Sequence, residues 1–302
     1  MWNRNTKKVF TSVRASFQST GGSQRVGGTK RIANTLGFSR QYSYKLKCEE
    51  QKIFHIKEQV KKLVHEQRIL LPRSGIKKIY GLIQPQLQVL SIKMGRDKLF
   101  KWMKSYNLLV TPRRNYVKTT DSNHWLKKYP NLVKGLTVVR PEQVWVSDIT
   151  YVKTDEGYLY LSMVTDAYSR KIVGYHIADN METSLVSRAL KMAIRGRLYD
   201  TDLIHHSDRG GQYCSKEYVQ IATDNRIQMS MTENGDPYEN ALAERMNKTI
   251  KEEFFPDRPF KSKDLAIKTT AQAVALYNQY RPHLALKFKT PDHVHKQKIP
   301  AI

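Results

Sequence analysis

Apolar residues recur with two different periods, and these periods divide the chain into two halves. In the first half they recur every three or four residues, which is typical of amphipathic helices. In the second half, short runs rich in β-branched and aromatic residues alternate with helical segments, which indicates strands. Both periods are interrupted in residues 111–140, which are rich in Pro, Arg and Thr and predict a linker.

The first half contains two helix-turn-helix candidates, the first of which spans Thr29 to Lys47. Its sequence predicts a short helix, a turn at Gly37, and a second basic helix capped by Ser39. In helix-turn-helix proteins the start of the second helix contacts DNA bases, so Arg40 and Gln41 are candidate DNA contacts. Two helices packed around a glycine are also common in ordinary helical bundles, and the pattern leaves that alternative open.

A second candidate lies further along the same half. A basic helix that Pro72 ends carries apolar residues at helical spacing, namely Ile53, Ile56, Val60, Leu63 and Leu70. This period is too short for a coiled coil and fits packing within a bundle. Residues 72–83 begin another helix, and residues 95–109 predict an amphipathic one. We therefore assign residues 29–110 to a helical, DNA-binding region.

The second half predicts a sheet with helices around it. Strands are expected at residues 144–154, 158–167 and 171–178, and the short turns between them indicate an antiparallel meander. Helices are then expected at residues 182–195, 215–225, 239–254 and 263–280, with strands at 203–208 and 227–231 between them. This order predicts an α/β fold in which helices flank a mixed sheet, and we assign residues 141–302 to it.

Composition limits the kinds of molecule that such a protein is expected to bind. The chain has 302 residues, of which 40% are hydrophobic, so it is long and apolar enough to build a core. Lys and Arg number 52 against 27 Asp and Glu, which gives a net charge of +25. So large a charge repels itself in a compact protein, and a polyanion relieves that repulsion. Nucleic acid is therefore the expected partner, ahead of an anionic membrane.

The apolar runs and the cysteines indicate where in the cell the protein is expected. No run approaches the ~18 residues of a membrane span, and no signal peptide is evident. Two cysteines, Cys48 and Cys214, cannot build a disulfide framework. We expect a cytoplasmic protein. Residues 1–28 are basic, rich in Ser, Thr and Gly, and without an apolar period, so they predict a disordered arm or sequence upstream of the natural start.

Three acidic residues of the second half stand in unusual places. Asp148 lies within an apolar strand, Asp208 ends a strand before two glycines, and Glu244 lies on a helix, with 35 residues between it and Asp208. Carboxylates that converge resist ionisation unless a cation neutralises them. In a basic chain, such a cluster indicates a divalent metal site that faces a phosphate backbone.

Each acid also has an ordinary interpretation. Asp148 could be an edge-strand acid, and Asp208 could belong to a simple turn. Glu244 shares a helix side with Asn240, Lys248 and Lys251, opposite the apolar stripe formed by Leu242, Met246, Ile250 and Phe254. A solvated, salt-bridged face is the usual outcome of that arrangement. The three placements together favour a site over three separate surface acids.

Several segments resemble one known family. These are WVSDITY, residues 157–175, HSDRGGQY, NALAERMNKTIKEEF and residues 277–291. They resemble the DDE transposases of bacterial insertion sequences, and more narrowly the catalytic subunit encoded by the second reading frame. The resemblance is strong over residues 140–295 and looser over 55–135. It implies the RNase H-like fold of the retroviral-integrase catalytic core.

The resemblance also implies roles for single residues. Asp148, Asp208 and Glu244 match the catalytic and metal-binding triad, which implies two Mg²⁺ ions, with Mn²⁺ as a possible substitute. Water would attack a phosphodiester at an element end, and the 3′-OH so freed would attack another. Lys251 matches the basic residue that contacts DNA beside the triad. Lys248, Arg245 and Arg209 are further candidate DNA contacts. His205, His206 and His283 need no catalytic role.

The expected partners follow from the same resemblance. They are the terminal inverted repeats of the element, the target DNA, and at least one further copy of the chain, because two ends must be joined. An upstream-frame segment, fused or associated, is a further expected partner, and the DNA-bound enzyme would associate with the nucleoid. Two alternatives stay open: a catalytically silent, transposase-derived DNA-binding regulator, and a nuclease of the RNase H type that cuts without joining.

Overall fold

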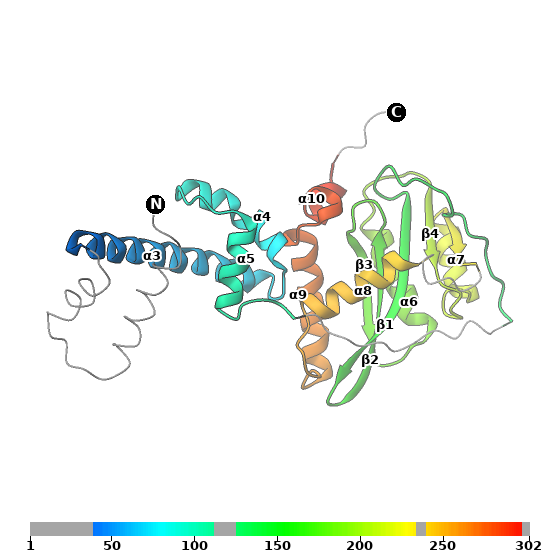
Figure 1. Ribbon diagram of the computed structural model, residues 1–302. Helices are drawn as coiled ribbons and strands as arrows, with labels where there is room; N and C mark the ends of the chain where they lie inside the picture. The colour runs from blue at the N-terminus through cyan, green and yellow to red at the C-terminus, as the bar shows by residue number, and fades with distance from the viewer. Residues whose placement is uncertain (1–38, 112–124, 234–239, 298–302) are drawn as a thin grey trace. The chain divides into compact units, whose positions relative to one another are not determined.

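The structure is a computed structural model that describes residues 39–111, 125–233 and 240–297 (Figure 1). The basic arm at 1–28, the first helix of the first helix-turn-helix candidate and part of the linker lie outside these residues. The chain forms two compact units, Met1–Leu63 and Val64–Ile302.

Helix α3 (Arg40–Leu70) is one continuous helix of 31 residues. Ser39 Oγ accepts a hydrogen bond from the Tyr42 backbone N–H (3.1 Å), as the sequence predicts for a helix cap. The expected boundary near Lys47 is wrong. No Gly or Pro interrupts the sequence between Cys48 and Leu70, so the backbone continues as a helix where we expected two.

Helices α4 (Ile76–Val89) and α5 (Arg96–Ser105) form the second predicted helix pair. They pack through buried apolar side chains, namely Ile79, Ile83, Leu87, Leu99 and Met103. Two ion pairs tie the start of this segment to the sheet domain, with Arg73 at 2.9 Å from Asp257 and Lys78 at 2.7 Å from Glu253. Glu253 also accepts a hydrogen bond from Arg281 at 2.7 Å.

Five strands form one mixed sheet in the order β3-β2-β1-β4-β5. They are β1 (Val144–Thr154), β2 (Gly157–Asp166), β3 (Ile172–Ala178), β4 (Leu203–Ser207) and β5 (Ile227–Met231). The first three are antiparallel, whereas β1, β4 and β5 pair in parallel. The predicted meander followed by alternating strands and helices is confirmed.

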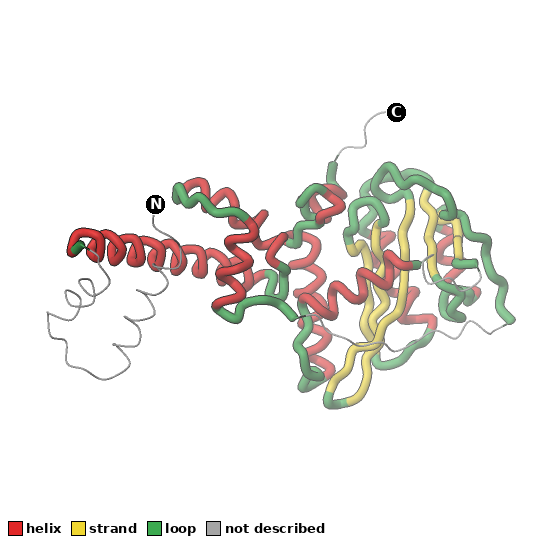
Figure 2. Tube along the Cα trace, in the orientation of Figure 1, coloured by secondary structure: helices red, strands yellow, loops and turns green. Residues whose placement is uncertain are grey.

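Helices cover both faces of the sheet (Figure 2). Helices α6 (Thr183–Arg195) and α7 (Lys216–Asp224) pack on one face, over a core that includes Trp145, Val164 and Leu203. Helices α8 (Ala241–Glu253) and α9 (Lys263–Tyr280) pack on the other, over Leu161 and Met163. The fold is therefore the α/β, RNase H-like arrangement that the sequence predicts.

A short 3₁₀ turn, η1 (Leu284–Leu286), and helix α10 (Pro291–His295) follow α9. Helix α10 was not predicted. His295 is fully buried between two equally buried acids, with its Nε2 at 3.3 Å from Glu142 and its Nδ1 at 3.8 Å from Asp166. Among the described residues, no helix is both long and apolar enough to span a membrane.

Candidate active site

The register of two parallel strands brings the first two acids together. Ser147 of β1 pairs with Ser207 of β4. Asp148 follows Ser147 within β1, and Asp208 is the first residue after β4. Because neighbouring strands lie about 4.8 Å apart, these two side chains leave the sheet next to each other.

The third acid comes from the helix that crosses this part of the sheet. Glu244 lies in the first turn of α8, which buries Ala243, Met246 and Ile250 beneath it. The Glu244 side chain stays exposed. Burial of part of the carboxyl group and the negative charge of Asp208 both raise its pKa. The charge of Asp208 thus acts on Glu244, and the place of Glu244 in the triad stays a prediction.

Asp148 is the most perturbed of the three. Burial first, and then the charges of Asp208 and Glu244, raise its pKa to about 7, although hydrogen bonds from Asn247 and from the Ile149 N–H work in the opposite direction. A carboxyl group in this position gains its charge easily only when a cation stands beside it. The electrostatics of the site thus favour a bound cation.

Two side chains of α8, and that of Asn240 directly before it, form hydrogen bonds to neighbouring parts of β1. Asn240 Nδ2 donates to Ser147 O (3.0 Å), Asn247 Nδ2 to Asp148 Oδ2 (2.8 Å), and Lys251 Nζ to Thr150 Oγ1 (3.2 Å). These bonds fix the helix that carries Glu244 over the strand that carries Asp148. The distance between the two acids is therefore set by side chains as well as by the apolar core.

These contacts correct the expected helix face. We placed Asn240 and Lys251 beside Glu244 on the side opposite the apolar stripe, but both turn toward β1, and Asn240 is buried. A polar side chain that bonds to a strand looks the same in sequence as one that faces water. Asn247 was missed, although it follows Ala243 by four residues and so falls within the buried stripe. A polar residue at a core position was the available signal.

Lys251 occupies a partly enclosed position. Its Nζ lies 4.5 Å from the centroid of the Tyr151 ring, which is a cation–π contact. Burial lowers the pKa of Lys251, and the charge of Asp148 opposes that change. The ammonium group is thus held at the edge of the acid cluster.

The other candidate DNA contacts divide between the two units. On α8, Arg245 and Lys248 are exposed, and Lys248 lies 3.8 Å from Glu252. Arg209 follows Asp208 and is partly buried. Arg40 and Gln41 begin α3 in the other unit, where Gln41 is exposed. The acid cluster and the cations of α8 therefore belong together, and Arg40 and Gln41 form a separate group.

A tight turn shapes the chain around Asp208. The Gly210 backbone N–H donates to Asp208 Oδ1 (3.0 Å). A Cβ atom on Gly210 would itself come within 3.0 Å of that oxygen, so a side chain there would displace the carboxylate. The glycine at position 210 is thus explained by the close approach of the backbone to this acid.

The histidines serve the interior, as expected. His205 and His206 are fully buried, and burial lowers the pKa of His205 to about 3, so it is neutral. Its Nε2 contacts Ser147 Oγ (2.8 Å), while His206 Nδ1 contacts Ser230 Oγ (2.8 Å). Burial and then the charge of Arg281 lower the pKa of His283 to about 3. Complete burial excludes phosphate contact for the first two.

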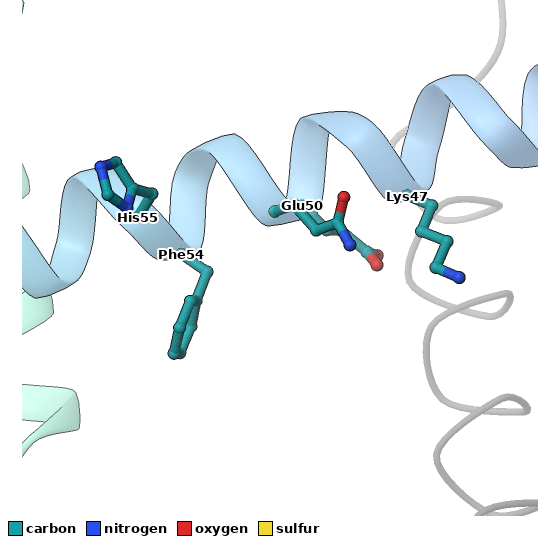
Figure 3. Close-up of a pocket in the computed structure, with 5 residues that line it drawn as sticks. Lys47, Glu50, Phe54 and His55 are labelled. Atoms are coloured by element: carbon teal, nitrogen blue, oxygen red, sulfur yellow. The ribbon is translucent and has the colours of Figure 1, made fainter.

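No group of three His, Cys, Asp or Glu side chains within residues 39–111, 125–233 and 240–297 is already gathered closely enough to hold a metal ion. The three acids supply the hard oxygen ligands that Mg²⁺ prefers. A separate hollow lies along α3, lined by Lys47, Glu50, Gln51, Phe54 and His55 (Figure 3). It contains a single carboxylate, so it offers no alternative acid cluster.

Comparison with known proteins identifies relatives of this domain. Two integrase core domain families match residues 138–237 and 225–291. A 31 kDa protein of insertion element IS600 from Shigella sonnei is 38% identical over 68% of this chain and 76% of its own length. The transposase of insertion sequence IS904 from Lactococcus lactis is 35% identical over 55% of this chain and 67% of its own length.

One solved structure resembles the sheet domain more distantly. The HTLV-2 integrase catalytic core, determined in complex with magnesium, is 21% identical, with a TM-score of 0.42 over 52% of this chain and 98% of that chain. A likeness at this level carries no argument about function. The sheet topology supports the fold, and the sequence relatives support the function.

Proposed function

Since this chain belongs to the family of insertion-sequence transposases with an integrase core domain, we infer that it catalyses DNA strand cleavage and strand transfer. It is therefore a polynucleotidyl transferase. We propose further that it acts at the inverted-repeat ends of an insertion sequence and at target DNA. The observation that supports these proposals is the register that sets Asp148 and Asp208 on neighbouring parallel strands, with Glu244 of α8 near enough for the charge of Asp208 to raise its pKa.

Divalent metal use fits the residues present. All three acids offer carboxylate oxygens, and the raised pKa of Asp148 indicates that the cluster needs a cation. Asn247 Oδ1 is buried without a hydrogen-bond partner in the described structure, so an acceptor oxygen is available on the residue that bonds Asp148. We propose that Asp148, Asp208 and Glu244 hold two Mg²⁺ ions, and that Mn²⁺ can replace them. Bound metal would stabilise the charge that develops on the reacting oxygens.

The side chains of the protein then have distinct tasks. Water attacks a phosphodiester and leaves a 3′-OH, and that 3′-OH attacks a second phosphodiester, so no protein nucleophile is required. Asn247 orients the Asp148 carboxylate through its 2.8 Å hydrogen bond. Lys251 offers a positive charge for a DNA phosphate next to the acids, and Arg245 and Lys248 extend that charge along the exposed side of α8.

DNA sequence would be read outside the catalytic domain. Helix α5 exposes Lys101 and Lys104 together with Phe100. We propose that the α4–α5 pair contacts the element ends, and that α3, with Arg40 and Gln41 at its start, adds further contacts. Base contacts supply sequence selectivity, whereas the large positive charge supplies affinity that does not depend on sequence. Two ends must be held together, so we propose at least a dimer on DNA.

A strand-transfer assay on element-end DNA with Mg²⁺ tests this function. Joined products support the transposase. Cleavage without joining would indicate a nuclease of the RNase H type, and binding alone would indicate a silent regulator. Fully folded protein that binds the ends, with Mg²⁺ present, and yields neither cleavage nor joining would overturn the proposal.

Replacing Asn247 by leucine is expected to weaken metal binding without loss of DNA binding. The change removes the hydrogen bond that holds Asp148 Oδ2 and that favours its charged form. Loss of such a supporting contact raises the Mn²⁺ concentration for half-saturation by about tenfold, which electron paramagnetic resonance measures directly. Asn225→Ala is the matched control, because it also removes one Asn side-chain hydrogen bond, to Ile221 O, at the end of α7. Equal Mn²⁺ affinity in wild type and Asn247→Leu would refute the role given to Asn247.

Replacing Lys251 by alanine is expected to weaken DNA binding more than metal binding. Its ammonium group is the cation held nearest to Asp148 by α8, so a phosphate contact would be lost. The slope of binding affinity against salt concentration, on logarithmic axes, should fall by about one. Lys268→Ala, on the exposed side of α9, is the control. Equal losses in DNA and Mn²⁺ affinity would contradict the assignment.

A further inference from the structure

Two tyrosines lie close together on the hairpin formed by β1 and β2, further along β1 than Asp148. Tyr151 lies three residues after Asp148, and Tyr158 is the second residue of β2. Their rings meet edge to face, with centroids 5.7 Å apart. Tyr158 is 52% exposed, so its ring presents a large apolar surface to solvent. No step of the reaction described above uses this pair.

Lys251 connects the tyrosines to the acids. Its Nζ bonds Thr150 Oγ1 at 3.2 Å and lies 4.5 Å from the centroid of the Tyr151 ring. Strand β4 pairs with β1 only as far as Ser147, so it does not cover the edge of β1 beyond that residue. Side chains alternate between the two faces of a strand, so Asp148 and Tyr151 point to opposite faces of β1, and Lys251 contacts the Tyr151 ring from the helix that packs on the Asp148 face.

We propose that Tyr158, with Tyr151 behind it and Lys251 beside it, forms a binding site for one unpaired nucleotide of the DNA strand. This inference rests on the proposed function and identifies how the strand next to the reacting phosphate is held. Lys251 binds the phosphate, and the Tyr158 ring stacks on the base. Every base has a π face, so the site accepts any of the four bases.

The spacing fits a nucleotide close to the reaction. Tyr158 pairs with Lys153, which lies five positions after Asp148, and five residues of β-strand span about 17 Å. Stacked nucleotides repeat every ~3.4 Å along a strand, so the bound base lies within about five nucleotides of the phosphate under attack. A base becomes available for stacking on a side chain only when it leaves its duplex, as at a frayed end.

The charged residues around Tyr158 limit the extent of the proposed nucleotide site. Lys153 pairs with Tyr158 across the two strands and is exposed, so it places a second cation beside the exposed ring. Beyond it, the hairpin turn carries Asp155 and Glu156, and Glu156 accepts a hydrogen bond from the Lys263 N–H (2.8 Å). Phosphates avoid these acids, so the strand would leave the protein surface before the turn.

Binding of a fluorescent oligo(dT) strand of about ten nucleotides to the full chain tests the proposal by anisotropy. Tyr158→Ala should weaken binding about tenfold, and Tyr158→Phe should bind as wild type, because it keeps the ring. On an abasic strand with the same phosphates, wild type and Tyr158→Ala should bind equally. Irradiation of strands that carry 5-iodouracil should crosslink the peptide that contains Tyr158.

Tyr280→Ala is the matched control, because Tyr280 is 46% exposed at the end of α9 and plays no part in this site. Equal oligo(dT) binding by wild type and Tyr158→Ala would overturn the proposal, as would a Tyr158→Leu variant that binds as tightly as Tyr158→Phe. If wild type binds the strand through Tyr158 but does not join element ends, the proposed function fails while the nucleotide site stands. Normal joining with unchanged Tyr158→Ala binding would overturn only the site.

Discussion

Replacing Glu244 by glutamine is expected to abolish both DNA cleavage and strand joining while DNA binding is retained. The substitution keeps the size of the side chain and removes its negative charge, so one ligand of the proposed metal ions is lost. Metal ions stabilise such a transition state by several kcal/mol, and losing that stabilisation corresponds to about a thousandfold or more in rate. A gel assay of cleaved and joined strands, with anisotropy for binding, measures the separate effects.

Glu252→Gln provides the matched control for this experiment. It makes the same chemical change on the same helix, at a residue that lies 3.8 Å from Lys248. We expect this variant to cleave and join DNA. Joining by Glu244→Gln at a rate near that of Glu252→Gln would contradict the assignment of Glu244 to the triad.

Replacing His295 by alanine is expected to lower the free energy of unfolding by about 3–5 kcal/mol, because it leaves two buried acids without their shared partner. His295 lies between Glu142 and Asp166, and all three side chains are fully buried. Urea denaturation at pH 6 measures the loss. His293→Ala is the control, since His293 lies on the same helix but is exposed, and its removal should change stability little.

The same cluster makes stability depend on pH. Burial works to lower the pKa of His295, but the bonds to Asp166 and Glu142 outweigh burial, so its pKa is raised above 6.5. The stabilisation from His295 is therefore complete below pH ~6.5 and is lost as pH rises through the folded-state pKa. Urea denaturation across this range should show a falling limb for wild type that is absent in His295→Ala. An identical falling limb in both proteins would show that another group is responsible.

Glu142 contributes at the opposite end of the pH range. Burial raises its pKa, but the bond to His295 and those from the Leu198 and Tyr199 N–H groups outweigh burial, so the pKa is lowered below 4.5. Its stabilisation is present above pH ~4.5 and is lost as pH falls through the lowered value. The cluster therefore holds α10 most firmly between these two limits.

The strand positions of Asp148 and Asp208 could be predicted because the neighbouring residues in the sequence define each strand. A β-branched run around Asp148 and an apolar run that ends at Asp208 each define a strand, and both strands are found. Their adjacency depends on the Ser147–Ser207 register, which sequence spacing alone does not define. The family resemblance supplied that step.

The contacts of α8 were only partly predictable. The apolar spacing located the helix, but Asn240 and Lys251 bond to β1 although we placed them beside Glu244 on the opposite side. Helical residues four apart differ by about 40° in direction, so a stripe read over several turns drifts around the helix. The buried Glu142–His295 contact was beyond prediction, because the two residues are far apart in sequence and each looks like an ordinary polar residue.

The ion pair between α4 and the end of α8 determines where the chain can be divided. Glu253 Oε1 lies 2.7 Å from Lys78 Nζ and 2.7 Å from Arg281 Nη2. A fragment that begins at residue 125 would keep all three candidate acids but would lose Lys78, together with the Arg73 partner of Asp257. Glu253, at the end of the helix that carries Glu244, would then keep only one of its two cationic partners, Arg281. A catalytic fragment should therefore begin before α4.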